Sequence, residues 1–335
     1  ISDSFQKANE FNGLRPTTST FEELKRDKLD IYATYDKGFR EHSFSVMGGY
    51  SYQKDKGQFL DASVDGASSD KVPTLTAGPN KKDANSALTQ DVTIGYFGRL
   101  TYDFMKKYLF SVTFREDASS RFAKGKQWGF FPGLSAGWII SDETFMQNIK
   151  NLNNLKFRVS YGQTGNNAIG LYDASGKYST NARYDGYAGI VASTMPNIDL
   201  TWETSTQLDL GFDLSLFNNR LGLTADYFDK RTENLLFSKE LPNTTGFSSV
   251  QTNIGEVKFY GFDLEIISSN IRKSNFEWDS KFTLSFVKNK VLKLPDNGRD
   301  RNRIGGITLA DGTAFGGTAE GEPLYRYYGY VVDYI

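Results

Sequence analysis

Residues 202–237 show the clearest alternation of apolar and polar positions in the chain. Every second residue from Leu208 to Leu216 is apolar, and the residues between them are polar or glycine. Successive side chains of a β-strand point to opposite faces, so this period of two predicts a strand with two different faces. Asn218 and Asn219 then favour a tight turn. The alternation resumes over 221–230, which predicts a hairpin whose arms exceed the usual strand length of about 5–6 residues.

The same period predicts about eleven strands in total. They are expected over 29–35, 44–52, 93–103, 108–115, 127–140, 155–162, 207–216, 221–230, 258–267 and 276–286, and from 325 onward. Residues 1–27 are polar and irregular and are expected to form a loop. The Ser-Asp-Glu run before Glu143–Lys150 resembles a helix cap and predicts one or two helical turns.

The expected connections alternate strictly between short and long. Short ones fall near residues 40, 105, 147, 218 and 272, and long ones near 70, 121, 182, 243 and 307. The long ones include 55–88 and 163–201. Outer-membrane barrels pair short periplasmic turns with long outer loops, whereas the loops of a β-sandwich need not alternate. We therefore expect an all-β chain that forms part of a large transmembrane β-barrel, with a β-sandwich as the alternative.

The polar faces of the expected strands carry many charges. In a barrel their apolar faces would contact lipid, and the charged faces would line a wet lumen, where ions cost less than in a dry core. In a sandwich the same charges would simply face solvent. The lumen-facing candidates are Arg99, Arg115, Arg158, Asp209, Asp213, Asp226, Glu277 and Asp279.

Composition narrows the functional classes. The formal net charge of −1 gives no reason to expect nucleic acid as a partner. Aromatic residues are abundant, with 26 Phe and 19 Tyr, as expected for a β-rich chain. The absence of cysteine excludes disulfides and thiolate metal sites. No apolar run reaches the roughly 20 residues that a membrane helix needs, and the N-terminus lacks the pattern of a signal peptide.

Several long blocks resemble the barrel of SusC/RagA-type TonB-dependent outer-membrane transporters. They include REDASSRFAKGKQWGFFPGLSAGWIISDETF (115–145), LKFRVSYGQTGNNAIG (155–170) and NIDLTWETSTQLDLGFD (197–213). The tracts at 226–266, YDKGFREHSFSVMGGYSYQ near the start and GEPLYRYYGY near the end fit the same family. The resemblance covers most of residues 30–330.

This resemblance implies a 22-stranded barrel in the bacterial outer membrane, closed by a plug domain. It also implies a SusD-like surface lipoprotein, energy from TonB, and an oligosaccharide or peptide as substrate. No plug or TonB-contact segment is evident here. We therefore expect residues 1–27 to be an extracellular loop segment and 28–335 to be an incomplete barrel within a longer polypeptide. A siderophore or vitamin receptor and a surface adhesin are the alternatives.

Other motifs favour structural roles. Gly133–Gly137 matches G-x-S-x-G, but a strand continues after it and the single histidine, His42, lies upstream, so an enzyme is the weakest reading. Asp61, Asp65 and Asp70, like Asp296, Asn297 and Asp300, lack EF-hand spacing, and we expect no metal and no cofactor. Trp202, Trp278, Phe217 and Tyr108 are candidates for interfacial girdles. The candidates for loop contacts with substrate or partner are Tyr172, Tyr178, Tyr184 and Tyr187.

Overall fold

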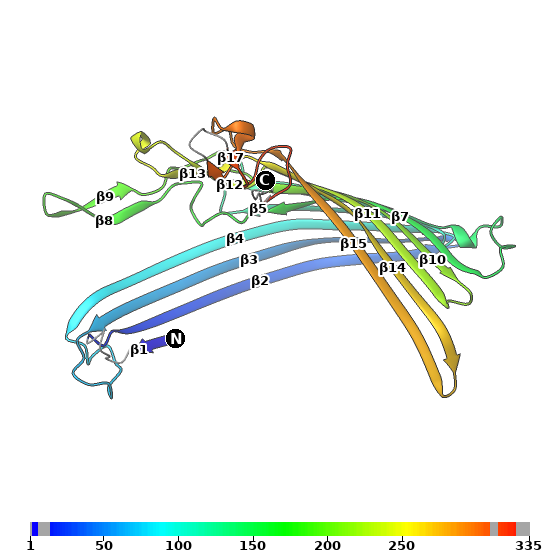
Figure 1. Cartoon of the computed structure of the whole chain (residues 1–335), viewed down its shortest axis with the longest axis horizontal. Helices are drawn as coiled ribbons and strands as arrows, with labels where there is room; N and C mark the ends of the chain where they lie inside the picture. The colour runs from blue at the N-terminus through cyan, green and yellow to red at the C-terminus, as the bar shows by residue number, and fades with distance from the viewer. Residues whose placement is uncertain (1, 6–13, 309–313, 326–335) are drawn as a thin grey trace, which may run out of the picture. The chain divides into compact units, whose positions relative to one another are not determined.

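The computed structural model describes residues 2–5, 14–308 and 314–325. Its main feature is a sheet of eleven strands in the order β1-β2-β3-β4-β5-β6-β7-β10-β11-β14-β15 (Figure 1). The pairings from β5 to β15 are antiparallel. The chain divides into two compact units: Ile1–Asp30 with Ser51–Ile94, and Ile31–Tyr50 with Gly95–Ile335. The expected all-β class is confirmed.

The strands of the main sheet are long. Their bounds are β1 Ser2–Phe5, β2 Thr17–Phe39, β3 His42–Asp65, β4 Asn80–Phe104, β5 Tyr108–Ser119, β6 Trp128–Ile139, β7 Leu152–Asn166, β10 Glu203–Leu216, β11 Leu221–Glu233, β14 Glu256–Lys273 and β15 Phe276–Lys293. Within the described residues, no helix has both the length and the apolar character needed to cross a bilayer.

Short hairpins interrupt the long loops. They pair β8 (Tyr178–Tyr184) with β9 (Tyr187–Ala192), β12 (Leu236–Glu240) with β13 (Ser249–Asn253), and β16 (Ile307–Thr308) with β17 (Ala314–Phe315). The expected strict alternation of short and long connections fails around β6: residues 120–127 join β5 to β6 where a long connection was expected, and the longer segment 140–151 joins β6 to β7 where a short one was expected. The other connections between neighbouring strands of the main sheet alternate as predicted. In Figure 1 the tight turns after β10 and β14 lie at one end of these strands, and β8, β9, β12 and β13 lie toward the other.

The first strands extend well beyond the predicted segments. Residues 1–27 were expected to be a loop, but β1 and the start of β2 at Thr17 fall within them. β3 and β4 take up much of the expected loop over 55–88. Both faces are polar there, so a hydrophobic period could not reveal them. Side chains that pair across the strands stabilise this polar part of the sheet. Arg26 donates a hydrogen bond to Asp55 at 2.8 Å, and Thr20 donates to Asp61 at 2.7 Å.

The predicted helix over Glu143–Lys150 is wrong. A single 3-10 turn, η1, covers Ile140–Asp142, and hydrogen bonds from residue i+3 to residue i continue it as turns to Ile149. The side chains that suggested a helix cap are engaged elsewhere. The Ser141 hydroxyl donates to the Asp142 carboxylate, and Glu143 accepts bonds from Tyr108 and Trp138.

The turn after β10 forms as expected. Phe217, Asn218 and Asn219 all have positive φ, between 56° and 61°, a conformation that asparagine tolerates well. His42 starts β3 and bonds the Tyr102 hydroxyl at 2.7 Å. Of the strand expected from residue 325 onward, Tyr325 lies in a turn and the rest lies outside the described residues.

Candidate functional site

The second unit of the sheet has one apolar face. Cross-strand partners form continuous apolar rows on it, such as Phe110, Ala136, Val159, Leu210, Tyr227, Phe262 and Phe286. Leu208 and Leu210 are each 37% exposed, and Phe282 and Phe286 are each 55% exposed. A second sheet packed on this face would have buried them. The structure therefore presents an uncovered apolar wall, as the barrel interpretation requires.

Aromatic rings follow the turn end of this wall. His42, Phe104, Tyr108 and Trp138 succeed one another with ring centroids 4.8, 6.1 and 6.4 Å apart. The Glu143 carboxylate accepts bonds from the Tyr108 hydroxyl at 2.7 Å and the Trp138 indole at 3.0 Å. These bonds lower the pKa of Glu143, which lies in the turn. Tyr108 therefore lies in a band of aromatic rings.

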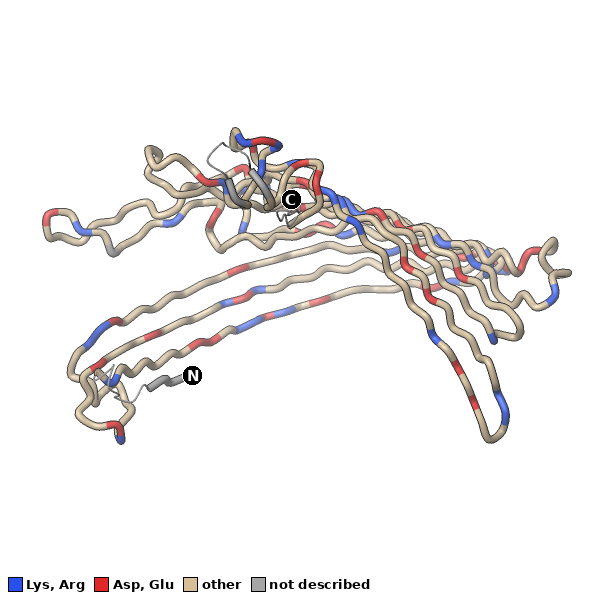
Figure 2. Tube along the Cα trace, in the orientation of Figure 1, with Lys and Arg blue, Asp and Glu red and all other residues tan. Residues whose placement is uncertain are grey.

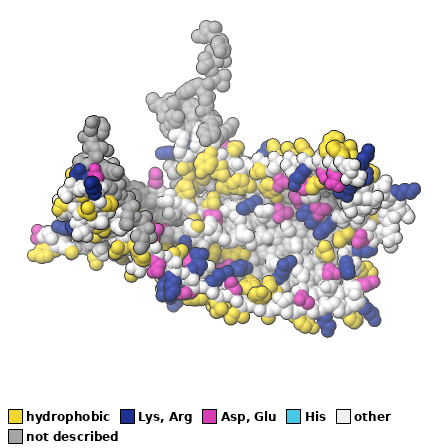
Figure 3. All heavy atoms as spheres, turned by 90° about the horizontal axis from the view of Figure 1, so that it is seen from below, with side chains coloured by type: hydrophobic (Ala, Val, Ile, Leu, Met, Phe, Trp, Pro, Cys, Tyr) yellow, Lys and Arg dark blue, Asp and Glu magenta, His cyan; other side chains and the backbone are white. Residues whose placement is uncertain are grey.

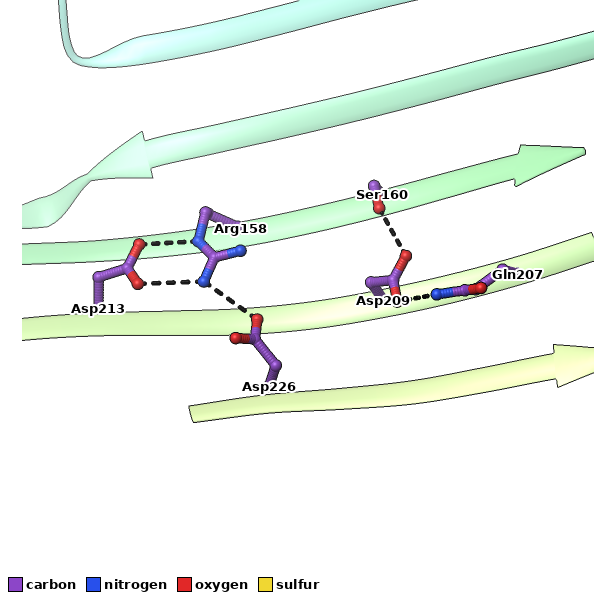
Figure 4. Close-up of polar contacts among 6 residues, drawn as sticks. All are labelled: Arg158, Ser160, Gln207, Asp209, Asp213 and Asp226. Carbon is purple, nitrogen blue, oxygen red and sulfur yellow. Dashed lines mark hydrogen bonds and ion pairs between the residues drawn. The ribbon is translucent and has the colours of Figure 1, made fainter. Parts of the chain in front are cut away.

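The opposite face carries a three-residue charge cluster (Figure 4). Arg158 on β7 donates two hydrogen bonds to the Asp213 carboxylate on β10, at 2.7 and 3.0 Å. The same guanidinium reaches over β10 to Asp226 on β11, at 3.0 Å. Gly211 lies between Arg158 and Asp226 in the cross-strand row, and a Cβ there would stand 2.4 Å from the Asp226 carboxylate. The glycine therefore makes room for the bridge.

A row of hydroxyl groups lies next to this cluster. Ser111, Ser135 and Ser160 are direct partners on β5, β6 and β7, and Ser160 donates to Asp209 on β10 at 3.0 Å. We call these four residues the serine row. Gln207 also donates to Asp209, at 2.7 Å (Figure 4). The row ends in a carboxylate that can accept further hydrogen bonds.

Two hollows flank the serine row. The first, of about 450 Å³, is lined by Arg99, Arg158, Lys156 and Gly211 with the serine row. The second, of about 510 Å³, is lined by Gly133, Gly162, Gln163, Gln207 and Lys230 with the same row. Gly211 in the first hollow, and Gly133 and Gly162 in the second, have no side chains to fill these hollows. Figure 3 shows, on one side of the molecule, white polar surface and backbone between charged groups of both signs. Such a wall offers hydrogen bonds and charges to a polar chain.

The predicted lumen-facing residues separate into groups. Arg99, Arg158, Asp209, Asp213 and Asp226 belong to the hollows or the charge cluster. Arg115 lies apart and bonds Asp117 at 2.6 Å. Glu277 and Asp279 lie on β15 near its turn, and Asp279 accepts a bond from Ser269. Gly211 was not predicted as a site residue, because its only signal was its isolated position within a strand.

A small hydrophobic core ties the long loops together. It consists of Phe122, Phe131, Ile169, Ala174, Leu200 and Trp202. The Trp202 ring lies 5.4 Å from both Phe122 and Phe131, and its indole donates to the Gln127 carbonyl at 2.8 Å. Trp202 is therefore not a girdle residue, contrary to expectation. Its indole has a hydrogen-bond partner inside the fold and does not need the membrane interface. Trp278 and Phe217, by contrast, are half exposed.

The β8–β9 hairpin extends from this core. Tyr184 and Tyr187 are cross-strand partners at its tip, 84% and 76% exposed. Tyr178 pairs with Ala192 at the other end, and Tyr172 lies in a separate turn with a φ of 67°. The four tyrosines therefore do not form one cluster. Two of them make an exposed aromatic tip.

Acidic residues of the candidate calcium loops pair with nearby protein groups. Asp65 is paired with Lys82 at 2.9 Å and Asp70 with Arg15 at 2.7 Å. Asp296 accepts the Gly298 amide. No group of three or more acidic or histidine residues in the described part of the chain is placed to hold a metal ion.

The comparisons with known proteins agree with this geometry. Residues 2–328 match the family model described as "TonB dependent receptor-like, beta-barrel". TonB-dependent receptor P3 of Formosa agariphila is 38% identical over 323 residues, which are 94% of this chain and 31% of that protein. TonB-dependent receptor SusC of Bacteroides thetaiotaomicron is 31% identical over 279 residues, which are 79% of this chain and 27% of that protein.

A solved structure shows the same fold. The RagAB peptide transporter superposes with a TM-score of 0.80 at 25% identity, covering 86% of this chain and 32% of that one. The chain therefore spans about a third of the length of the curated relatives that it matches.

Proposed function

Because this chain belongs to the TonB-dependent receptor family of bacterial outer-membrane β-barrels, we propose that it forms part of the wall of a transporter that imports oligomeric nutrients. The cargo would be an oligopeptide or a glycan. The observation that supports this most directly is the two-faced sheet, with an uncovered apolar face opposite a face that carries the charge cluster and two hollows. Membership in a family of receptors confirms the expectation that the chain is not an enzyme.

The polar face would serve as the inner wall of the transport path. Its acceptors, such as Asp209, and its donors, such as Arg99 and Arg158, suit a chain rich in amides or hydroxyls. Arg115, Asp213, Asp226, Glu277 and Asp279 would face the same lumen. Energy would come from TonB through a plug domain that we place outside residues 1–335. Residues 1–27 would lie on the outer side.

We further propose that a SusD-like lipoprotein covers the loop end of this wall. The likeness to the RagAB peptide transporter supports both such an assembly and a peptide cargo, and the likeness to SusC supports the same transporter class. The tip residues Tyr184 and Tyr187 would provide aromatic contact area, because such rings bury much surface at low entropic cost.

An exchange of the β8–β9 hairpin tests the proposal. Residues 178–192 of the full-length protein would be replaced by those of a relative with a different substrate. The core at Ile169, Leu200 and Trp202 holds the flanking segments, so the exchange leaves the base of the loop intact. We expect altered uptake of labelled peptides or glycans, or weaker copurification of the lipoprotein.

The matched control exchanges the tight turn over 217–220 at the opposite end, which we expect to leave both readouts unchanged. Unaltered uptake and unaltered lipoprotein binding after the hairpin exchange would contradict the role of this loop. Uptake of a ferric siderophore in place of peptide or glycan would favour the siderophore class. Surface adhesion without any uptake would favour an adhesin.

A further inference from the structure

Three cations face one another directly across neighbouring strands. Arg231 on β11 is the register partner of Lys258 on β14, and Lys258 is the partner of Lys290 on β15. Lys288 lies in the next row, opposite Tyr260. We call these four residues the cation row, although Lys288 lies one register row closer to the apolar surface than the other three. Figure 2 shows Lys and Arg positions side by side where these strands approach their loop end.

The cation row marks the limit of the apolar face. On β15 the outward positions over 276–286 are apolar except at Ser280, and the next two are Lys288 and Lys290. A membrane-crossing strand needs about 9–11 residues, so the apolar stretch ends where the bilayer core is expected to end. The long loops lie on the outer side in barrels of this kind. In that orientation the cations would lie at the level of the outer-leaflet headgroups.

The row is only partly neutralised. Arg231 contacts Glu256 at 2.5 Å and Glu233 at 3.1 Å, and Lys258 contacts Asp229 at 2.6 Å. Neither Lys288 nor Lys290 has an ion pair among the described residues, and both are exposed. Like charges directly opposite each other destabilise a sheet. An external anion that bridged the row would remove this repulsion.

We propose that the cation row binds the phosphate of an outer-leaflet lipid headgroup. This inference rests on the proposed outer-membrane function only for the orientation of the sheet. The surface below the row suits a lipid rather than a free anion, because Tyr227, Phe262 and Phe286 form an exposed apolar row for acyl chains. Lys288 lies 5.2 Å from the Phe286 ring, which places a charge directly above this apolar surface.

Native mass spectrometry of the full-length protein in a neutral detergent tests the proposal. The probes are diphosphoryl lipid A, the same lipid without its phosphates, and inorganic phosphate. The test variant is Lys288→Gln with Lys290→Gln, which removes the two lysines that lack ion pairs. The control, Lys273→Gln with Lys281→Gln, removes the same charge from the other end of the strands. Heat-dependent gel mobility confirms that each variant is folded.

We expect the wild type and the control to bind diphosphoryl lipid A, and the test variant to bind it about tenfold more weakly. Equal binding of lipid A with and without phosphates would overturn the proposal, as would unchanged binding by the test variant. Competition by equimolar inorganic phosphate would assign the row to a free anion instead. Substrate uptake is measured separately, so loss of lipid binding with intact uptake separates this inference from the proposed function.

Discussion

Arg158 and Asp226 lie on strands that do not pair with each other, yet their side chains meet at 3.0 Å. The contact crosses β10 above Gly211, the residue that pairs with both of them. Asp213 holds the other side of the guanidinium. The Arg158 guanidinium thus links three consecutive strands on the polar face. The link depends on Gly211, which has no side chain to block it.

Replacing Gly211 with alanine should disrupt this link. The new Cβ would stand 2.4 Å from the Asp226 carboxylate and 2.6 Å from Cζ of Arg158, so the bridge would have to open. We expect a loss of about 1–3 kcal/mol in the free energy of unfolding, as is typical for overpacking. Urea unfolding of the full-length protein in detergent measures it.

Gly162 provides the matched control on the same face. A Cβ there meets nothing within 4 Å, so Gly162→Ala gains the same strand propensity without a clash. Equal free energies of unfolding for the two variants would show that the bridge across Gly211 does not stabilise the fold.

Replacing Trp202 with alanine should loosen the long loops. The change empties the centre of the loop core and removes the bond to the Gln127 carbonyl. We expect limited proteolysis to cut faster within 120–127 and 167–177, because these segments pack around the indole. Trp128→Ala, at a half-exposed tryptophan, should leave the cleavage rate unchanged. Equal rates in the two variants would contradict the role of the core.

Acidification should loosen the segment after β15. The Glu320 carboxylate accepts bonds from the Asn302 side chain at 3.0 Å and the Leu294 amide at 2.8 Å, which lower its pKa below the usual 4.5. Because the folded-state pKa is depressed, the stabilisation is present above pH 4.5 and is lost as the pH falls through the lower value. Hydrogen exchange over residues 294–304 should therefore accelerate in that range.

The variant Glu320→Gln serves as the control for this pH dependence. It removes the ionisable group, so any acceleration that Glu320 causes should be absent from it. An identical pH profile in both proteins would show that another group controls the segment.

Strand phase was predictable wherever one face is apolar and the other polar. The alternation over 208–216 fixed which residues share a face, and the structure confirms it. Thr17–Asp27 escaped prediction because both of its faces are mostly polar, and its strand depends on backbone pairing with its neighbours β1 and β3. The position of Trp202 depends on Phe122 and Phe131, which lie on other elements. Period-two patterning contains no information about such contacts.

The charge cluster was only half predictable. Arg158, Asp213 and Asp226 could be assigned to one face, but their contact depends on β7 pairing with β10 past the β8–β9 hairpin. That register follows from the assembled sheet. The glycine at 211 was a local indication that another side chain approaches the backbone.

The central claim is that the apolar face contacts lipid and the polar face contacts water. Residues 1–335 contain no cysteine, so single cysteines at positions 207–210 and 212–214 can be spin-labelled one at a time in the full-length protein in liposomes, after any cysteine elsewhere in it is replaced by serine. Collision with oxygen, which concentrates in lipid, and with a water-soluble nickel chelate should alternate along the strand. We expect high oxygen access at 208, 210, 212 and 214, and high nickel access at 207, 209 and 213. Low access to both reagents at the even positions would indicate a buried core and contradict the account.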